Sequence, residues 1–546
     1  MSATFEAVFA TAVLEEVAER FHLELELVAT PDGRALRLPF WRVTSLRHNG
    51  RPLVDLGAIE ALAARHGFSV DDGGIVITPA PDAEERLRGL CTELMEHDPE
   101  AFFRLPSRDI QLPASGDLPE SRAWLERYYG DGFTVREKKN IVFDLGRSQG
   151  PYLRSVDRDA LQIIDAASQI ATLPAGARPG LVQAALDDGR LDAHLLSAQD
   201  TRPQDAPATA EFAKAVVALG SPRLKYLSLT NGGSEAIEKA LHLARRYGGL
   251  MGGPGRRLGA PMGTRIVAFE GSFHGRTLLP LFSTWNEEKR APYQLAGFET
   301  LWAPFPASAP GVDATFPAGW QAAWSDPKGA RDFALDAPAS GEDPEVDRTR
   351  LAAELAALRV VESHLQRGDV FALLLEPYQC EGGDRAATLR FFSAIRALTH
   401  AYGVPFIFDE VQSGFGLSGS FFWHRRFWLT DAHGQPDGPD LIAGAKRAQT
   451  GYVLSRWPDP YPTWAHSASV VRGRIHVDIL EPAVTLAGIV ADGLGRLVQK
   501  YPRLVSNARA VGDAFAFDLP TPAIANHLIE QRFYRGLMVY IAGEKT

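Results

Sequence analysis

Strand-like and helix-like patterns alternate along the middle of the chain, from about residue 205 to residue 455. The strand-like runs are short, almost continuously apolar and bounded by turn formers, and they lie at 224–230, 265–271, 370–377 and 405–410. Residues 234–248 and 389–403 instead carry apolar residues at helical spacing. Parallel strands that are covered on both faces read as near-continuous apolar runs. The pattern therefore predicts an α/β fold with a mainly parallel sheet between helices.

The segments on either side of this region have different patterns and predict separate domains. Residues 1–125 mix helical and strand patterns, beginning with an amphipathic helix over 1–21, and end at the turn-rich PASGDLPES. We expect an accessory region there, with no motif that indicates a role. Residues 126–204 are expected to form the N-terminal part of a small domain with its linker, and 205–465 the large domain. Residues 466–546 then supply a C-terminal α+β part of the small domain.

Composition and charge exclude several classes of protein. The sequence is 45% hydrophobic and 23% charged, and its net charge of -10 argues against nucleic acid or an anionic membrane as the partner. No apolar run approaches the ~18 residues of a membrane-spanning helix. The N-terminus lacks the basic start of a secretory signal, so we expect a cytoplasmic protein. Two cysteines, Cys91 and Cys380, are too few for a disulfide framework or a cysteine zinc site, and no metal site is predicted.

The stretch IFDEVQSGFGLSG, residues 407–419, fits three cofactor hypotheses. Its first part is compatible with the Walker B strand of an ATPase, but the chain contains no Gly-Lys dipeptide and hence no P-loop. GFGLSG has the spacing of a dinucleotide fingerprint, but EVQS separates it from the strand and no helix start follows it. The third hypothesis places Asp409, at a strand end, under the ring nitrogen of pyridoxal 5'-phosphate.

Pyridoxal phosphate requires a lysine for its imine, an acid for its ring nitrogen and helix N-terminal amides for its phosphate. Lys446 follows Asp409 in the sequence, among small residues after an apolar run. Asn231-Gly232-Gly233-Ser234 joins a strand to a helix and offers amides and a hydroxyl. Taken alone, these features also fit a surface lysine, an exposed strand-end acid and a helix N-cap at Ser234. Their order within one α/β domain favours the cofactor.

A set of motifs makes the sequence resemble the class III aminotransferases, which are pyridoxal phosphate enzymes of fold type I. The motifs are SQIATLPAG (168–176), LTNGGSEAIEKA (229–240), FEGSFHGRT (269–277), LLLEPYQCEGGD (373–384), FIFDEVQSGFGLSG (406–419) and AKRAQTG (445–451). The resemblance covers about residues 130–546, and the combined set is highly specific. SFHGRT and EPYQCEGGD are most similar to the motifs of 4-aminobutyrate and lysine 6-aminotransferases.

The resemblance implies a role for individual residues. Lys446 would form the imine and move the substrate proton, and Asp409 would pair with the ring nitrogen. The other implied cofactor contacts are Gly233, Ser234, Phe273, Glu376, Val411 and Gln412. Ile170, Arg276 and Glu381 are the implied substrate contacts. Arg276 would hold the distal carboxylate, and Glu381 would pair with an arginine near the C-terminus of the family's fold.

The sequence departs from the family at two places. RIHVDILEP, residues 474–482, has no hydroxyl where the family places a Thr or Ser that reaches the partner subunit's phosphate. The sequence reaches GEKT before the family's arginine-bearing strand, so 466–546 is expected to be an incomplete domain.

We therefore expect a homodimeric transaminase that moves an amino group from an ω-amino acid or diamine to a 2-oxo acid such as 2-oxoglutarate. The amino donor is expected to be of the 4-aminobutyrate, lysine or ornithine type. The alternatives are another class III pyridoxal phosphate enzyme, such as an aminomutase, or a non-catalytic module with this fold in a larger protein.

Three further residues have conspicuous positions but plainer expected roles. His274, in SFHGRT, is predicted to pack or to donate a hydrogen bond, and Cys380 to be a small filler rather than a redox-active thiol. His424, followed by two arginines, is predicted to be solvated or to contact a partner subunit.

Overall fold

The chain folds as two compact units in the computed structural model. Met1–Ala166, Gly176–Arg178 and Gln531–Met538 form the first unit, and Ala167–Ala175, Pro179–Glu530 and Val539–Thr546 form the second. The structure describes residues 26–30, 33–39, 47–48, 51–52, 56–71, 74–78, 80, 82–96, 118–130, 141–148, 150–157, 162–191, 207–251, 263–307, 344–427, 437–483, 486–533, 536–543 and 546. The amphipathic helix that the sequence predicts over 1–21 lies outside the described residues.

The N-terminal part of the first unit contains a four-stranded antiparallel sheet in the order β1-β2-β6-β5. Its strands are β1 (Glu26–Thr30), β2 (Gly33–Pro39), β5 (Ser69–Asp71) and β6 (Gly74–Ile77). A short ladder joins β3 (Arg47–His48) to β4 (Arg51–Pro52), and the helices are α3 (Leu56–Arg65) and α4 (Ala83–Glu96). Apolar residues of the helices and of the sheet are fully buried, among them Leu36, Leu62, Ile77, Leu87 and Leu90.

The rest of the first unit joins segments from far apart in the sequence. It contains α6 (Pro119–Gly130), β7 (Tyr152–Arg154), β8 (Gln162–Asp165) and β20 (Leu537–Met538). The three strands form a sheet in the order β20-β8-β7, in which β20 runs parallel to β8. Their small core consists of Leu118, Ile141, Leu153, Ile163, Phe533 and Met538.

The second unit is built on a seven-stranded sheet in the order β11-β10-β12-β15-β16-β17-β9. The strands are β9 (Tyr226–Thr230), β10 (Arg265–Phe269), β11 (Glu299–Ala303), β12 (Val370–Leu375), β15 (Phe406–Asp409), β16 (Leu441–Gly444) and β17 (Gly451–Ser455). Six of the seven strands run in the same direction, and β17, between β16 and β9, runs in the opposite direction. The prediction of an α/β fold with a mainly parallel sheet is therefore confirmed.

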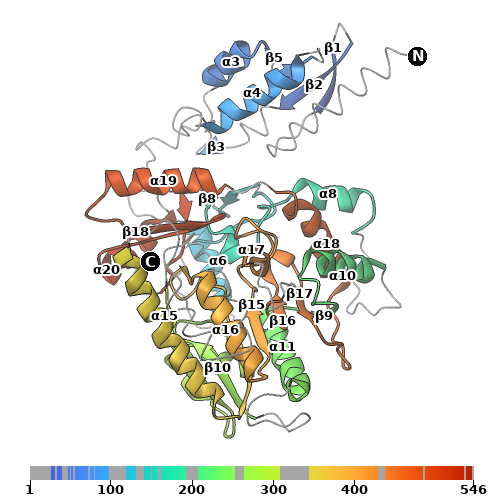
Figure 1. Cartoon of the computed structure of the whole chain (residues 1–546). Coiled ribbons are helices and arrows are strands. Elements are labelled where there is room, and N and C mark those ends of the chain that lie inside the picture. Colours follow the sequence, from blue (N-terminus) through green and yellow to red (C-terminus); the bar gives the residue numbers. More distant parts are fainter. Residues whose placement is uncertain are drawn as a thin grey trace. The chain divides into compact units, whose positions relative to one another are not determined.

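Alternate residues of the strands enter two separate cores, one on each face of the sheet. In β15, for example, Phe406 and Phe408 belong to one core and Ile407 to the other. The helix α11 (Gly233–Tyr247) packs on the Ile407 side, and α15 (Pro344–Leu365) and α16 (Leu389–Ala401) on the opposite side (Figure 1). This sandwich explains why the sequence of each parallel strand is apolar at nearly every position.

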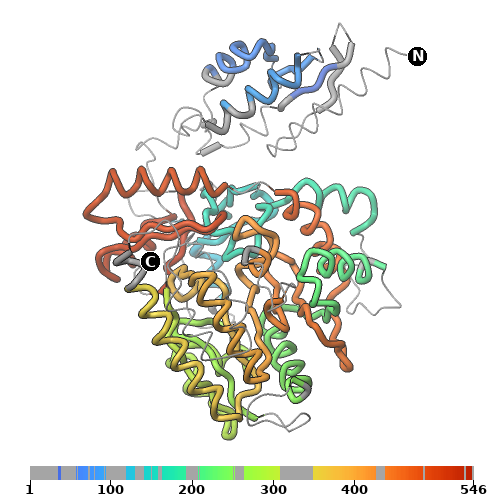
Figure 2. The backbone as a smooth tube through the Cα atoms, in the orientation of Figure 1, coloured from blue at the N-terminus to red at the C-terminus, as the bar shows by residue number. Residues whose placement is uncertain are grey.

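Two further helices contribute to the larger core. They are α10 (Pro207–Leu219) and α18 (Ser467–Leu480). Figure 2 shows the green backbone of α10 beside the orange-red backbone of α18, so the helix before the first sheet strand packs on one that follows the last. No helix in the described ranges is long and apolar enough to cross a membrane.

The remaining elements of the second unit are short or lie at its C-terminal end. The short ones are α7 (Ser168–Ala171), α8 (Gly180–Asp187), α12 (Leu278–Phe282), α13 (Glu287–Arg290), α17 (Trp423–Phe427), β13 (Tyr378–Gln379) and β14 (Arg385–Ala386). The 3-10 turns are Gly248–Leu250, Ala291–Tyr293 and Lys446–Ala448. The C-terminal ones are α19 (Ala487–Lys500), β18 (Ser506–Val511), β19 (Ala514–Asp518) and α20 (Pro522–Gln531), with β18 and β19 paired as an antiparallel hairpin.

Candidate active site

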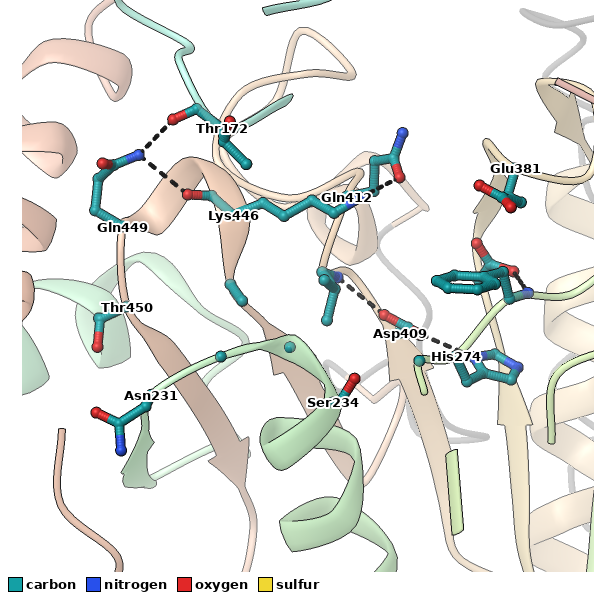
Figure 3. A pocket seen from close by; sticks show the side chains of 17 residues that line it. Thr172, Asn231, Ser234, His274, Glu381, Asp409, Gln412, Lys446, Gln449 and Thr450 are labelled. Atoms are coloured by element: carbon teal, nitrogen blue, oxygen red, sulfur yellow. Dashed lines mark hydrogen bonds and ion pairs between the residues drawn. The ribbon is translucent and has the colours of Figure 1, made fainter. Parts of the chain in front are cut away.

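A cavity of about 390 Å³ opens at the carboxyl ends of the sheet strands, where α11 begins (Figure 3). Its walls come from the segments that directly follow β9, β10, β12, β15 and β16. Ligands of open α/β sheets bind at this edge. The residues that the sequence analysis proposed and that line the cavity are Gly233, Ser234, Phe273, Glu376, Glu381, Asp409, Val411, Gln412 and Lys446. Ile170 and Arg276 are not among the lining residues.

Asp409 is the last residue of β15, and its carboxylate is held by two donors. Its Oδ1 accepts a hydrogen bond from the Val411 amide at 3.0 Å, and its Oδ2 lies 2.8 Å from Nδ1 of His274. Both side chains are buried. Because a carboxylate only accepts, Nδ1 of His274 carries the proton of this bond. The carboxylate is therefore fixed in direction before any ligand arrives.

His274 reaches Asp409 from the turn that follows β10. Its backbone amide donates to Oγ1 of Thr284 at 3.0 Å, which fixes the backbone that carries the imidazole ring. The sequence analysis expected His274 to pack or to donate a hydrogen bond, but it gave no partner. The two residues are far apart in the chain, and only the adjacency of β10, β12 and β15 in the sheet brings the turn after β10 toward the end of β15.

Lys446 begins a tight turn directly after β16, and its backbone has a left-handed φ of 46°. Its Nζ donates to Oε1 of Gln412 (Figure 3). The side chain of Gln449 holds the turn by donating to the carbonyls of Thr172, at 2.7 Å, and of Lys446, at 3.2 Å. Burial lowers the pKa of Lys446 from its usual value. A lysine with a lowered pKa reaches its neutral, proton-accepting form at a lower pH.

The N-terminus of α11 forms a cradle that suits an anion. Its N-cap is Gly232, which provides no side-chain cap, so the first amides of a 15-residue helix face the cavity. Helix N-termini bind phosphate through such amides and through the helix dipole. The interpretation of Ser234 as the N-cap is wrong, because Ser234 lies inside the helix.

Glycine is required at two positions of this cradle because the packing leaves no space for a side chain. A Cβ on Gly233 would lie 2.6 Å from Cγ1 of Val411. A Cβ on Gly275 would lie 2.4 Å from Oγ of Ser234, and Gly275 has a φ of 127°, which other residues rarely adopt. The backbone and Val411 are therefore packed closely around the helix start.

Glu376 follows β12 and is a second buried acid near Asp409. Its Oε1 accepts the backbone N–H of Phe273 at 2.8 Å, which fixes the segment that carries the Phe273 ring. Burial, together with the nearby charge of Asp409, raises the pKa of Glu376 well above its usual value. The site therefore disfavours the charged form of Glu376, which still accepts a hydrogen bond from the Phe273 amide.

The two proposed residues outside the lining lie on exposed backbone segments. Ile170 is 45% exposed and belongs to the four-residue left-handed turn over 168–171. Such a turn is unfavourable for residues other than glycine, at ~1–2 kcal/mol per residue. Arg276 is exposed, and its Cζ lies 5.8 Å from the centroid of the Phe273 ring. Their roles as substrate contacts stay predictions.

Glu381 lines the cavity and forms an ion pair that the sequence did not indicate. Its Oε1 lies 3.4 Å from Nζ of Lys289, a residue of α13. The resemblance implied an arginine from the C-terminal part of the fold as the partner. In the described part of that region, Gly543 reaches this loop, where its amide donates to the Glu381 carbonyl at 2.9 Å.

His424 does not have the solvated or partner-contacting position that we expected. It is buried, its Nδ1 lies 3.0 Å from Oε1 of Glu410, and its Nε2 accepts the Ser221 amide at 3.1 Å. Glu410 also accepts the amides of Trp423 and His424. Glu410 is therefore part of the core behind Asp409, and the prediction for His424 is wrong.

The two remaining sequence features, Cys380 and the segment RIHVDILEP, lie in ordinary structural surroundings. Cys380 is buried, and burial raises the pKa of its thiol well above the usual value, so it stays in the unreactive thiol form. This agrees with its predicted role as a filler. Residues 474–480 of the segment RIHVDILEP continue the helix α18, in which Arg474 and Asp478 form an ion pair.

The fold and the site together define a pyridoxal phosphate enzyme of fold type I. The family model for class III aminotransferases matches residues 133–458. The chain belongs to this family, and it is a pyridoxal phosphate-dependent aminotransferase, as the sequence motifs predicted.

Individual relatives support the same assignment. The L-lysine-epsilon aminotransferase of Mycobacterium bovis is 29% identical over 440 residues, which cover 74% of this chain and 86% of that protein. The 4-aminobutyrate aminotransferase of Dictyostelium discoideum is 27% identical over 473 residues, covering 81% and 86%. The solved structure of lysine aminotransferase from M. tuberculosis matches with a TM-score of 0.62 and 25% identity, covering 77% of this chain and 92% of that one.

The residues of the cavity fit pyridoxal phosphate. The uncapped start of α11 is suited to the phosphate, and the carboxylate of Asp409 to a protonated ring nitrogen. Lys446 is a buried amine in the same cavity and suits the cofactor aldehyde. Phe273, which also lines the cavity, offers an aromatic ring. The assignment of individual contacts among these residues remains a prediction.

Proposed function

We propose that this chain transfers an amino group from an ω-amino acid or a diamine to a 2-oxo acid such as 2-oxoglutarate. The amino donor is of the 4-aminobutyrate, lysine or ornithine type, in keeping with the names of the relatives above. The observation that carries the proposal is the shared position of Lys446, Asp409 and the helix start at Gly233 around one cavity. We further propose that the protein acts as a homodimer in the cytoplasm.

The cofactor, when bound, supplies an aldehyde and an electron-withdrawing ring that acidifies the carbon next to the substrate nitrogen. Asp409 would hold a proton on the ring nitrogen, and the His274 hydrogen bond keeps the carboxylate aligned for it. Burial and the nearby charge of Asp409 raise the pKa of Glu376, which disfavours a second negative charge beside Asp409.

Lys446 is the group that would take up the proton from the substrate carbon that carries the amino group. Its lowered pKa makes the neutral amine available, and a general base works best when its pKa lies near the operating pH. Gln412 accepts a hydrogen bond from Nζ and thereby directs the amine into the cavity. The side chain of Gln449 donates a hydrogen bond to the Lys446 carbonyl and thereby holds the Lys446 backbone in place.

An absorption experiment with a panel of donors tests this proposal. The purified protein, loaded with pyridoxal phosphate, is expected to show the visible band of a lysine-bound cofactor. We expect 4-aminobutyrate, lysine or ornithine to bleach the band, and 2-oxoglutarate to restore it with formation of glutamate. The matched α-amino acid alanine is expected to react more slowly than the best ω-amine.

Other outcomes assign the protein differently. Isomerisation of a donor without any dependence on a 2-oxo acid would assign it to the aminomutases. A band that no amine bleaches would indicate a non-catalytic module. Sedimentation velocity tests the homodimer independently of turnover.

A further inference from the structure

Two segments that lie far apart in the sequence meet at the cavity, and both have an unusual backbone. In the first, the residues over 168–171 all have positive φ values, of 47°, 50°, 59° and 59°, and none of them is glycine. Residues with a side chain adopt this left-handed conformation only where the surrounding structure holds them in it. In the second, Lys446 and Gln449 have left-handed φ values of 46° and 60°. The contacts that hold these two backbones are therefore part of how the site is built.

The left-handed turn over 168–171 is closed by its own hydrogen bonds. The Thr172 amide donates to the Ser168 carbonyl at 2.8 Å, which spans the turn. Oγ1 of Thr172 donates back to the Gln169 carbonyl at 2.7 Å. The Thr172 side chain is thus used within the turn, and the Thr172 carbonyl connects the turn to another segment.

Gln449 makes this connection with its side-chain amide. Its Nε2 donates to the Thr172 carbonyl at 2.7 Å and to the Lys446 carbonyl at 3.2 Å (Figure 3). A side-chain amide has two N–H groups, and here they bind the backbones of two different segments. Thr172, Lys446 and Gln449 all line the cavity. One side chain at the site therefore joins the backbone of the reacting lysine to the left-handed turn.

We propose that Gln449 is a positioning residue of the transfer reaction, whose amide braces the backbone of Lys446 against the left-handed turn. The inference rests on the proposed transaminase function and adds the segment 168–172 to the structure that holds the reacting amine. Gln449 acts through Lys446 and not on the substrate. Its loss is therefore expected to slow the proton transfer without weakening the binding of the donor, and to release the turn.

The first test measures the half-reaction of the protein loaded with pyridoxal phosphate with 4-aminobutyrate alone. Gln449→Met keeps an unbranched, neutral side chain of similar length but has no N–H group. We expect the limiting rate to fall by about 3- to 30-fold, the contribution of one or two neutral hydrogen bonds. The half-saturating concentration of 4-aminobutyrate is expected to change by less than about threefold.

Two further variants separate the hydrogen bonds from the packing. Gln449→Arg retains N–H donors in one plane and is expected to recover part of the limiting rate. Gln183→Met makes the same change at an exposed glutamine of α8, and it is expected to behave as the wild type.

Hydrogen exchange, followed by mass spectrometry, measures the turn without any turnover. The amides of Thr172 and Leu173 both donate to the Ser168 carbonyl. In Gln449→Met they are expected to exchange about 3- to 30-fold faster, since the turn opens more often without its partner. Peptides from β12 and β15 are expected to exchange as in the wild type, and Gln449→Arg to show intermediate exchange in the turn.

A glycine separates the two ends of the connection. Ala171→Gly adopts the left-handed backbone without strain, so in the Gln449→Met background it is expected to restore slow exchange in the turn. The limiting rate is expected to stay low, because Lys446 still lacks its brace. Ala185→Gly, in the right-handed helix α8, is the matched control and is expected to restore neither property.

Three results would overturn the inference. Gln449→Met could leave the exchange of the turn unchanged, or raise the half-saturating concentration at a constant limiting rate. Ala171→Gly could restore the limiting rate, which would mean that Gln449 acts on the turn alone. Faster exchange of the turn in Gln449→Met, combined with a wild type that no amine bleaches, would instead contradict the proposed transaminase function and support the connection between the two segments.

Discussion

The floor of the cavity, by which we mean Asp409, His274, Glu376 and Lys446, is built differently from its rim, by which we mean Glu381 and its partner Lys289. Asp409, His274 and Glu376 are at most 5% exposed, and the Asp409–His274 bond is 2.8 Å long. At the rim, the Lys289–Glu381 pair is 3.4 Å long and half-exposed. A buried polar group without its partner is costly, whereas an exposed ion pair contributes about 0–1 kcal/mol. The floor is therefore fixed by its own hydrogen bonds, whereas the pair at the rim can open at little cost in free energy.

The largest effect is expected when the floor loses its reactive amine. Lys446→Ala removes both the cofactor attachment and the proton-moving group, so the half-reaction with any donor is expected to slow by about 10²–10⁴-fold or more. The visible band of the lysine-bound cofactor is expected to disappear as well. Lys225→Ala serves as the matched control and is expected to retain both. A band that survives in Lys446→Ala would mean that another lysine carries the cofactor.

The next largest effect is expected from the residue that aligns the floor. His274→Ala removes a charge-assisted hydrogen bond to Asp409, so the limiting rate of the half-reaction is expected to fall by about 10- to 100-fold. The half-saturating donor concentration is expected to stay nearly constant, because His274 acts through Asp409 rather than on the substrate. His274→Asn retains a donor and is expected to recover part of the rate. Equal rates for Ala and Asn would restrict His274 to a packing role.

The contrast between floor and rim also explains what the sequence predicted. Lys446, Asp409 and Glu376 lie in motifs directly after apolar strands, and parallel strands place such residues at one edge of the sheet. The partner of His274 depends on the spatial order of the strands, which local patterns do not contain. The Lys289–Glu381 pair is further from any motif, since α13 is a four-residue helix with an unremarkable sequence. The prediction for His424 was wrong because it was based on the polarity of the side chain. His424 is buried because Glu410, a buried acid, pairs with it, and a local pattern does not show this partner.

A smaller, pH-dependent effect is expected from the support behind Lys446. His476 is buried, its Nδ1–H donates to the Arg447 carbonyl at 3.1 Å, and burial lowers the pKa of His476 to about 4. The unfolded chain takes up this proton near pH 6.5, before the folded protein does. The contribution of His476 to stability is therefore complete above pH 6.5 and is lost as the pH falls toward 4.

Urea unfolding at pH 7 and pH 5 measures this dependence. The contribution of His476 to the free energy of unfolding is expected to fall by about 2 kcal/mol from pH 7 to pH 5. His476→Gln is expected to be less pH-dependent by that amount, and the exposed His527→Gln is expected to keep the slope of the wild type. Identical slopes in wild type and His476→Gln would show that His476 is not a neutral buried group.

The smallest effect is expected at the boundary between floor and rim, which the chain crosses within one peptide bond. Cys380 is 4% exposed, whereas the side chain of its neighbour Glu381 is 51% exposed. Because burial raises the pKa of the Cys380 thiol, its reaction with a thiol reagent is expected to be slow in the folded protein and fast in urea. The measurement uses a Cys91→Ser background, so that Cys380 is the single thiol.

Cys380→Ser is expected to change the rate of the half-reaction by less than about threefold. The thiol makes its polar contact, a 3.8 Å bond to the Tyr378 carbonyl, with the backbone. Rapid labelling of the folded protein would place Cys380 on the rim, and the boundary would then lie deeper in the cavity.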